Sequence, residues 1–265
     1  MKISLIITTY NWSDALKLVL ESIKRQVILP NEVIIADDGS NNETKELIKN
    51  YKKNFPINII HCWQEDKGFR AARIRNMAIA TSSYEYIIGI DGDIILDKYF
   101  VKDHIKHAKK GRYIQGSRVL TTKQTTNQLL KEYKELSFFS KGLKNRKNSI
   151  RSNILSKIFS KETLSLRGVK TCNFSIYKSD IEKINGFDNN FIGWGREDSD
   201  FVARFLNSGG KRFNLKFNAI AYHLYHNENS RKALEENDIR LKNSIENRVT
   251  ICNNGLKELD SVTII

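Results

Sequence analysis

The stretch YEYIIGIDGD, from Tyr84 to Asp93, decides how this chain folds. Its first seven residues are mainly aromatic and β-branched, which favours a buried β-strand. The strand runs directly into Asp91-Gly92-Asp93. Residues two apart on an extended chain point to the same side, so both carboxylates could address one ligand, and Gly92 would let that ligand approach the backbone. Ordinary Asp-Gly turn chemistry is the alternative explanation of the triplet.

Strand-like runs of this kind alternate with helical patterns along the chain. Ser13 is expected to N-cap the first helix. Alternating strands and helices predict an α/β fold with a mostly parallel sheet and right-handed crossovers. The other expected strands are ISLIITT (3–9), EVIIADD (32–38), INIIHCW (57–63), CNFSIYK (172–178) and AIAYHLYH (219–226); the expected helices begin at Ser13 and Ser179 and cover 42–51, 69–80 and the polar stretch 229–249.

Three of the expected strands end in polar residues, namely 8–11, 37–38 and 91–93. In parallel sheets ligands bind beyond the carboxyl ends of the strands, so these ends should converge at one edge. A hard divalent cation with phosphate oxygens is the natural partner of the acidic triplet. Asp37 and Asp38 could accept hydrogen bonds from a base or a ribose, or could simply belong to the start of the next helix.

The composition is that of an ordinary globular chain of 265 residues, 40% hydrophobic and 28% charged. The formal net charge of +14 favours an anionic partner without choosing among nucleic acid, phospholipid and a phosphorylated substrate. The lysines are scattered and no helix-turn-helix, RRM or zinc-finger signature occurs, which argues against nucleic acid. Three widely spaced cysteines suit a reducing cytoplasm. The apolar run at the N-terminus is too short for a signal peptide, so the protein is expected to be soluble or attached to a surface.

The segment 141–170 is strongly basic, with nine Lys and Arg residues against the single acid Glu162. Apolar residues stand among them at roughly helical spacing. Two interpretations remain open: a mobile, solvated basic loop, or a basic amphipathic helix that lies on an anionic membrane. The apolar residues are Ile150, Ile154, Leu155, Ile158 and Phe159.

Three further motifs carry chemistry. GFRAARIRN (68–76) places three arginines at a helix start, where they could neutralise a diphosphate or form a solvated face. His223 and His226 are three apart on an expected strand and would face opposite sides, so at most one easily joins the acidic triplet; a structural histidine is the alternative. GWGREDSDF (193–201) is either a turn into a helix with acids at its favourable end or a carboxylate held beside an aromatic platform.

Taken in order, VIIADDGS, GFRAARIRN, YIIGIDGD, YIQGSRVL, GWGREDSDF and AYHLYH resemble glycosyltransferase family 2 with the GT-A fold. The C-terminal part resembles the galactosyltransferase-type domain of β-1,4-galactosyltransferases and bacterial chondroitin polymerases. The resemblance covers roughly residues 2–227 and leaves out the basic insertion and the tail. It implies a Rossmann-like, mostly parallel central sheet flanked by helices, divided into a nucleotide-binding half (1–120), a basic insertion (about 140–170), an acceptor-side part (171–227) and a polar helical tail (228–265).

On the donor side the resemblance implies a pocket for the nucleoside, with Asp38 preferred to Asp37 as the partner of uracil. Asp93 would bind Mn2+ or Mg2+ directly, His223 would be the metal histidine with His226 as the alternate, and Asp91 would reach the ribose or the hydration shell of the metal. The donor-binding residues implied are Thr8, Tyr10, Asp37, Asp38, Arg70, Arg75, Asp91 and Gly92.

On the acceptor side the resemblance implies that Trp194 stacks on sugar beside Gly195. Asp198 would be the general base, and Glu197 would hold acceptor hydroxyls. Arg196 stands where related sequences often carry glycine, so it would either contact an acidic acceptor or be tolerated at a turn.

The function expected on this basis is a metal-dependent, inverting transfer of a hexose from a UDP-sugar to a cell-surface glycan such as capsule, lipopolysaccharide or O-antigen. Galactose or N-acetylgalactosamine is the first expectation, and glucose or N-acetylglucosamine the alternative. The acceptor would be a glycan or lipid-linked glycan, with the enzyme cytoplasmic and peripheral on the inner face of the membrane. A nucleic-acid-binding protein and a catalytically inactive carbohydrate-binding relative are the competing classes.

Overall fold

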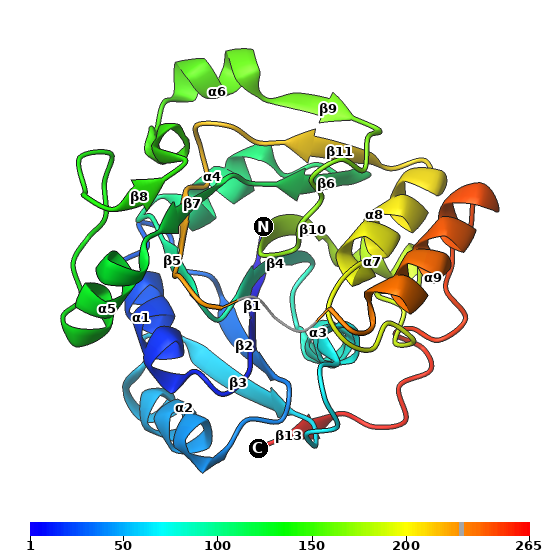
Figure 1. The fold of residues 1–265 in the computed structure, drawn as a ribbon, viewed down its shortest axis with the longest axis horizontal. Helices are drawn as coiled ribbons and strands as arrows, with labels where there is room; N and C mark the ends of the chain where they lie inside the picture. Colours follow the sequence, from blue (N-terminus) through cyan, green and yellow to red (C-terminus); the bar gives the residue numbers. More distant parts are fainter. Residues whose placement is uncertain (228–230) are drawn as a thin grey trace.

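The strand with which the sequence analysis began, β4 (Tyr86–Asp91), lies at the centre of a nine-stranded sheet in the computed structural model (Figure 1). The structure describes residues 1–227 and 231–265. From one edge to the other, the strands of the large sheet are β13 (Thr263–Ile264), β3 (Asn58–Trp63), β2 (Glu32–Asp37), β1 (Ile3–Thr9), β4, β10 (Asn173–Tyr177), β6 (Arg112–Gln115), β11 (Lys211–Asn214) and β9 (Lys161–Thr163).

Six of these nine strands run in one direction: β3, β2, β1, β4, β6 and β11. The antiparallel strand β10 separates β4 from β6, while β13 and β9 close the two edges in the antiparallel sense. The mostly parallel sheet expected from the alternation of strands and helices is therefore confirmed.

A second, smaller sheet has four short strands in the order β5 (Ile94–Leu96), β12 (Ala221–His223), β7 (Arg118–Thr121) and β8 (Leu143–Lys144). Because β5 starts just after β4 ends, the chain turns at Gly92-Asp93 and passes from one sheet to the other. This turn places the acidic triplet between the two sheets.

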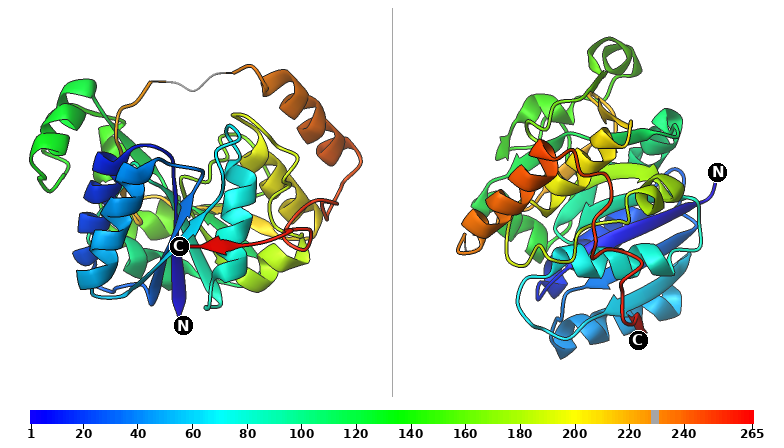
Figure 2. Two further views of the ribbon diagram at one scale, coloured as in Figure 1. Left: turned by 90° about the horizontal axis from the view of Figure 1, so that it is seen from below. Right: turned by 90° about the vertical axis from the view of Figure 1, so that its right-hand side faces the viewer.

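Helices cover both faces of the large sheet (Figure 2). One buried cluster contains residues of α1, α2 and α4, and another, on the opposite face, contains residues of α3, α7 and α8. The helices are α1 (Ser13–Lys24), α2 (Asn42–Asn54), α3 (Ala71–Thr81), α4 (Phe100–His107), α5 (Lys123–Lys131), α6 (Asn153–Phe159), α7 (Lys178–Lys183), α8 (Glu197–Asn207) and α9 (Leu234–Glu246), with a 3-10 turn at Arg146–Ser149.

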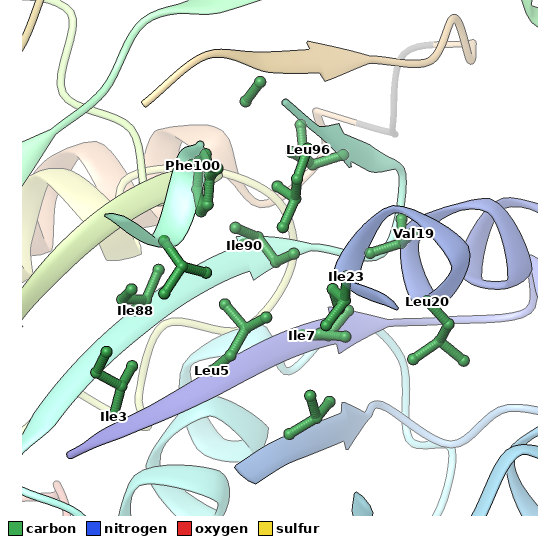
Figure 3. Close-up of a cluster of buried hydrophobic side chains, with 14 of the residues drawn as sticks. Ile3, Leu5, Ile7, Val19, Leu20, Ile23, Ile88, Ile90, Leu96 and Phe100 are labelled. Atoms are coloured by element: carbon green, nitrogen blue, oxygen red, sulfur yellow. The ribbon is translucent and has the colours of Figure 1, made fainter. Parts of the chain in front are cut away.

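Alternation along β1 shows why these residues form the layers. Ile3, Leu5 and Ile7 belong to the cluster on the α1 face, where the close-up shows Ile7 next to Ile23 of α1 (Figure 3). Ile6 belongs to the cluster on the opposite face. Successive side chains of a strand point to opposite faces, so a strand buried on both sides has a nearly continuous apolar sequence.

Three local expectations need correction. The N-cap of α1 is Trp12 rather than Ser13, whose hydroxyl donates instead to Glu43. The strand expected over 219–226 is only three residues long, ending at His223. In the tail, the helix spans 234–246, the residues after it are irregular except for β13, and the expected start at Asn229 lies outside the described residues.

The basic segment 141–170 is built into the fold instead of lying apart from it. It supplies β8 to the small sheet and β9 to the edge of the large sheet, with the short helix α6 between them. Among the helices of the described residues, none is both long enough and apolar enough to cross a membrane.

Gly89, in the middle of β4, provides a test of the packing between β4 and β10. A Cβ atom at this position would lie 2.0 Å from Cε1 of Phe174. We expect Gly89→Ala to lower the free energy of unfolding by about 1–3 kcal/mol, because the ring must move within a packed core. Urea denaturation measures this, and the double variant with Phe174→Leu should lose less than the sum of the two single changes. Additive losses would contradict a direct clash.

Candidate active site

The three polar strand ends meet at one edge of the large sheet, as expected. Thr9 of β1 pairs in register with Asp37 of β2, and Thr8 pairs with Asp91 of β4. Beyond the strands, the backbone N–H of Asp38 donates to the Thr9 carbonyl (3.0 Å) and that of Gly92 donates to the Thr8 carbonyl (2.7 Å). The ends of β2 and β4 are thus fixed on either side of β1.

Arg75 of α3 occupies the centre of this edge and is only 7% exposed. Its guanidinium donates to Oδ1 of Asp91 (3.2 Å), to Oε1 of Glu197 (3.1 Å) and to the Thr8 hydroxyl (3.3 Å). Arg75 therefore joins the donor half predicted from the sequence to the start of α8 on the acceptor side. Its three protein partners make Arg75 a structural link, and its expected place near the nucleotide stays a prediction.

Asp93, His223 and His226 form a cluster whose ligand atoms all lie within 4.8 Å of one another. Oδ2 of Asp93 is 3.5 Å from Nε2 of His223 and 3.4 Å from Nε2 of His226. The other oxygen, Oδ1, is buried without a hydrogen-bond partner among residues 1–227 and 231–265. One carboxylate and two imidazoles are a common donor set for a divalent cation, and the unpartnered oxygen is available to bind one.

The electrostatics of the cluster also suit a cation. Burial, together with the negative charge of Asp91, raises the pKa of Asp93 to about 8. Burial, together with the positive charge of Arg118, lowers the pKa of His223 to about 3, so this imidazole is in the neutral form that binds metal. The buried carboxylate is ionised at neutral pH only if a positive charge compensates it, as a metal ion does. The residues present therefore fit a divalent cation.

The cluster bears on the expectations for two residues, His226 and Asp91. His226 joins His223 instead of replacing it, because β12 ends at His223 and the opposite-sides rule for strands does not apply beyond it. Asp91 is not part of the cluster, and Arg75 binds its carboxylate, so its expected reach to the ribose or to the hydration shell of the metal stays a prediction. Gly92 itself is required for packing, since a Cβ there would lie 2.8 Å from the Thr9 hydroxyl.

The two aspartates at the end of β2 both accept hydrogen bonds from protein groups. The carboxylate of Asp37 is occupied by protein, with Nε2 of His61 at 2.9 Å from one oxygen and the N–H of Ser40 donating to the other (2.8 Å). Asp38 accepts hydrogen bonds from the side chain of Gln64 and the backbone N–H of Arg70 (2.8 Å), and burial raises its pKa. Both oxygens of each aspartate thus have protein partners, and the preference for Asp38 as the residue that faces the base stays a prediction.

The remaining donor-side residues lie around this edge. Tyr10 is half exposed, and its hydroxyl donates to Asp66 (2.9 Å). The guanidinium of Arg70 donates to the carbonyl of Glu65, while Arg73 donates to Oε1 of Gln64 (2.8 Å). The arginines of GFRAARIRN thus mainly hold protein groups in place.

Sequence reasoning missed two cations near the reacting centre. The charge of Arg118, at the start of β7, lowers the pKa values of both Asp93 and His223. Lys170 interacts electrostatically with His223. Burial lowers the pKa of Lys170, and the charge of Asp198 opposes this shift. Arg118 lies within the quoted motif YIQGSRVL, just after a strand. This position in the sequence could have marked Arg118 as a candidate site residue.

On the acceptor side, Asp198 lies in the first turn of α8 beside Glu197. One of its oxygens accepts the backbone N–H of Ser199 (2.7 Å). Burial and then the negative charge of Glu197 raise the pKa of Asp198 to about 7, while Arg75 opposes the shift. A carboxylate with a pKa near neutrality is well matched to accept a proton.

Trp194 precedes this turn and is 38% exposed. The guanidinium of Arg231 lies 5.7 Å from the centre of its ring. A surface hollow of ≈ 490 Å³ lies next to this loop along α9, and its lining residues are Arg231, Leu234, Glu235, Asp238, Ile239 and Lys242.

The loop that carries Trp194 is held by α9, which lies beside α8 (Figure 1). Arg196 has a positive φ of 77°, a conformation that favours glycine, and its side chain forms an ion pair with Asp238. The amide of Asn237, buried at 1% exposure, donates to the carbonyls of Ile192 (3.2 Å) and Gly195 (2.9 Å). Arg196 thus attaches the loop to the tail helix, a role that neither sequence-based explanation anticipated.

The fold and the site together define a glycosyltransferase with the GT-A fold. The chain belongs to Glycosyl transferase family 2, whose model matches residues 4–164, and a second model, the N-terminal domain of galactosyltransferase, matches residues 155–227. The family expected from the motifs is confirmed. The two matches run through 141–170, so the expectation that this segment lies outside the family's region is wrong.

Named relatives and a solved structure agree with this assignment. The chain is 25% identical over 248 residues to chondroitin synthase of Escherichia coli, covering 83% of this chain and 34% of that protein. It is 29% identical over 222 residues to the O-antigen chain rhamnosyltransferase RfbN of Salmonella typhimurium, covering 80% and 63%. The crystal structure of TarS 1–349 from S. aureus in complex with UDP has a TM-score of 0.61 at 16% identity, covering 94% and 65%, which shows a shared fold. The chain spans about a third of the length of the chondroitin synthase.

The clamp between α9 and the Trp194 loop can be tested directly. Asn237→Ala leaves two partly buried carbonyl groups without their donor, which should cost about 1–3 kcal/mol of stability. We expect faster amide hydrogen exchange in residues 192–196, measured by mass spectrometry. Asn243→Ala, an exposed position on the same helix, is the matched control. Equal exchange of the loop in both variants would show that Asn237 does not hold it.

Proposed function

We propose that this chain is a metal-dependent, inverting glycosyltransferase that moves a hexose from a UDP-sugar to a hydroxyl of a cell-surface glycan. One observation carries the proposal: a cation-binding cluster and a buried carboxylate of raised pKa lie on the two sides of Arg75 at the same sheet edge. The UDP in the TarS structure, which shares this fold, supports a nucleotide-sugar donor.

On the donor side, Asp93, His223 and His226 would hold Mn2+ or Mg2+, which when bound neutralises charge on the departing diphosphate. Arg118 and Lys170 add positive charge beside the cluster and stabilise the same developing negative charge. Asp38, with Thr8 and Tyr10 at the ends of β2 and β1, would bind the nucleoside, and a carboxylate there can accept the imide N–H of uracil.

On the acceptor side, Asp198 takes the proton of the acceptor hydroxyl as its oxygen attacks the anomeric carbon. The bond from that carbon to the diphosphate oxygen breaks, and its electron pair leaves with UDP. One displacement inverts the configuration, so an α-linked donor gives a β-linkage without a covalent enzyme intermediate. Glu197, fixed by Arg75, raises the basicity of Asp198 and could accept hydrogen bonds from neighbouring hydroxyls, while Trp194 offers an apolar face to a sugar ring.

Galactose or N-acetylgalactosamine is the proposed sugar, supported by the match of residues 155–227 to the N-terminal domain of galactosyltransferase. UDP-glucose and UDP-N-acetylglucosamine are the alternative donors. The names of the relatives, a chondroitin synthase and an O-antigen chain transferase, support a glycan acceptor. A lipid-linked glycan as acceptor would place the enzyme in the cytoplasm at the inner face of the membrane.

A panel of UDP-sugars with Mn2+ tests the function, because slow hydrolysis releases UDP without an acceptor. We expect UDP release from one or two donors. With the acceptor present, Asp198→Asn should keep the affinity for UDP and lose transfer by about 100-fold or more, since the base is gone. UDP affinity is measured by calorimetry and transfer by mass spectrometry of the product. No UDP release from any donor would contradict the function, and near-normal transfer by the variant would mean another base.

The metal assignment has its own test. Asp93→Ala should weaken Mn2+-dependent binding of UDP by about 100-fold, because it removes the only carboxylate of the cluster in the described residues. Titration calorimetry with and without EDTA measures the metal-dependent part. His107→Ala, which changes a histidine of α4 outside the cluster, is the control. Unchanged Mn2+-dependent affinity in Asp93→Ala would refute the site.

The raised pKa of Asp198 predicts an acid limb in the pH profile of transfer. The base works only when ionised, so the rate should be full above about pH 7 and should fall as the pH drops through that value. Glu197 raises this pKa and Arg75 lowers it, while Lys170 and Tyr113 also interact with the carboxylate. Glu197→Gln removes the negative neighbour and should move the limb to lower pH by about one unit. If the pH dependence of transfer is unchanged in Glu197→Gln, the group that titrates is not Asp198.

A further inference from the structure

The helix α6 exposes apolar side chains that the proposed reaction does not use. Ile154 and Ile158 are one helical turn apart and are 74% and 66% exposed, and Phe159 beside them is 56% exposed. Ser156, by contrast, is buried and faces the body of the protein. Because positions i and i+4 lie on one face of a helix, the outward face of α6 is an isoleucine ridge.

The helix is fixed to the body at both ends, so this exposure is a property of the fold. At its start, the side-chain oxygen of Asn153 accepts from Nζ of Lys106 (2.9 Å), and the N–H of Ser152 donates to the Phe217 carbonyl (2.9 Å). After its end, the Ser160 hydroxyl accepts the N–H of Lys216 (2.9 Å). Figure 1 shows α6 projecting beyond β9 and β11 as the outermost element of that side.

Positive charge surrounds the isoleucine ridge. Lys157 lies on α6, Lys161 follows it, and the contacts above bring Lys106 and Lys216 to its two ends. The only acid of the segment, Glu162, is neutralised by Arg112 (2.6 Å) and Lys211 (3.3 Å). Within residues 1–227 and 231–265, these four lysines form no ion pair. An apolar ridge among such lysines is complementary to an anionic lipid surface, where the apolar side chains enter the headgroup boundary and the lysines meet phosphate.

The structure assigns the α6 face, defined by Ile154, Ile158 and Phe159 with the lysines around them, as the surface that docks this chain on an anionic membrane. An anionic nucleic acid would satisfy the lysines but not three exposed apolar side chains. The inference rests on the proposed function in one respect: the reason for docking would be to bring the enzyme to a lipid-linked acceptor. The binding itself requires neither donor nor catalysis.

Flotation of the whole chain with lipid vesicles tests the assignment. We expect binding to vesicles of phosphatidylcholine with phosphatidylglycerol, little binding to pure phosphatidylcholine, and weaker binding as salt rises. Ile154→Ser with Ile158→Ser should reduce the partition coefficient by about tenfold or more, because two apolar side chains are lost from the interface. Lys157→Ser with Lys161→Ser should also weaken binding, and this loss should shrink at high salt.

Matched controls come from surfaces elsewhere on the chain. Ile239→Ser with Ile245→Ser removes two exposed isoleucines of α9, and Lys45→Ser with Lys49→Ser removes two exposed lysines of α2. Both controls should bind vesicles as the wild type does. Equal losses in controls and α6 variants, or equal binding to neutral vesicles, would overturn the assignment. Light scattering would also overturn the assignment if the wild type were a dimer and the isoleucine variants were monomers. The ridge would then be an interface between two copies of the chain.

The vesicle assay separates this inference from the proposed function. A chain that binds anionic vesicles through α6 but releases no UDP from any donor would refute the transferase and leave the docking surface standing. A chain that transfers sugar normally but ignores anionic vesicles would refute the docking surface alone.

Discussion

The site depends on one buried cation. Arg75 is almost completely removed from solvent and is compensated by Asp91 on β4 and Glu197 on α8, with the Thr8 hydroxyl of β1 as a third partner. Removing one partner of a buried ion pair leaves an uncompensated charge, which typically costs about 3–5 kcal/mol. The positions of β1, β4 and α8 are therefore coupled through a single side chain. That coupling brings Glu197 to the carboxyl ends of strands that lie about a hundred residues earlier in the chain.

The same ion pairs divide the site into two electrostatic environments. On one side, Asp93 and two histidines form a partly buried cluster that could hold a metal ion, and Arg118 adds positive charge beside it. On the other side, Glu197 and burial make Asp198 more basic than an ordinary aspartate. Charge stabilisation on the leaving-group side and proton acceptance on the attacking side are what a single displacement needs. Arg75 links the two sides through its ion pairs with Asp91 and Glu197.

Segments that seem peripheral in the sequence turn out to support this arrangement. The tail contributes α9, which holds the Trp194 loop through Asn237 and the Arg196–Asp238 pair, and β13, which pairs with β3 at the far edge of the sheet. The basic segment contributes β9 to the other edge and presents the α6 face outward. Both segments therefore stabilise the fold, in addition to any role in binding acceptor or lipid.

The sequence alone determined the layers of the fold and the kind of residues at the carboxyl ends of its parallel strands. Strand periodicity and apolar runs are local properties, so β1 to β4 and their helices could be located from the residues themselves. The convergence of 8–11, 37–38 and 91–93 followed because parallel strands end at the same edge. The family resemblance supplied the roles proposed for Asp93 and Asp198.

Only the tertiary structure decided which of these side chains face one another. Arg75 and Glu197 are 122 positions apart, so nothing in either local pattern indicates their contact. His226 joins Asp93 because the chain leaves the strand after His223, and Arg196 meets Asp238 because α9 folds back on α8. Local periodicity determines which face of an element is buried. Contacts between distant segments depend on how loops turn and on which charges must be neutralised, and these are settled only when the whole chain is packed.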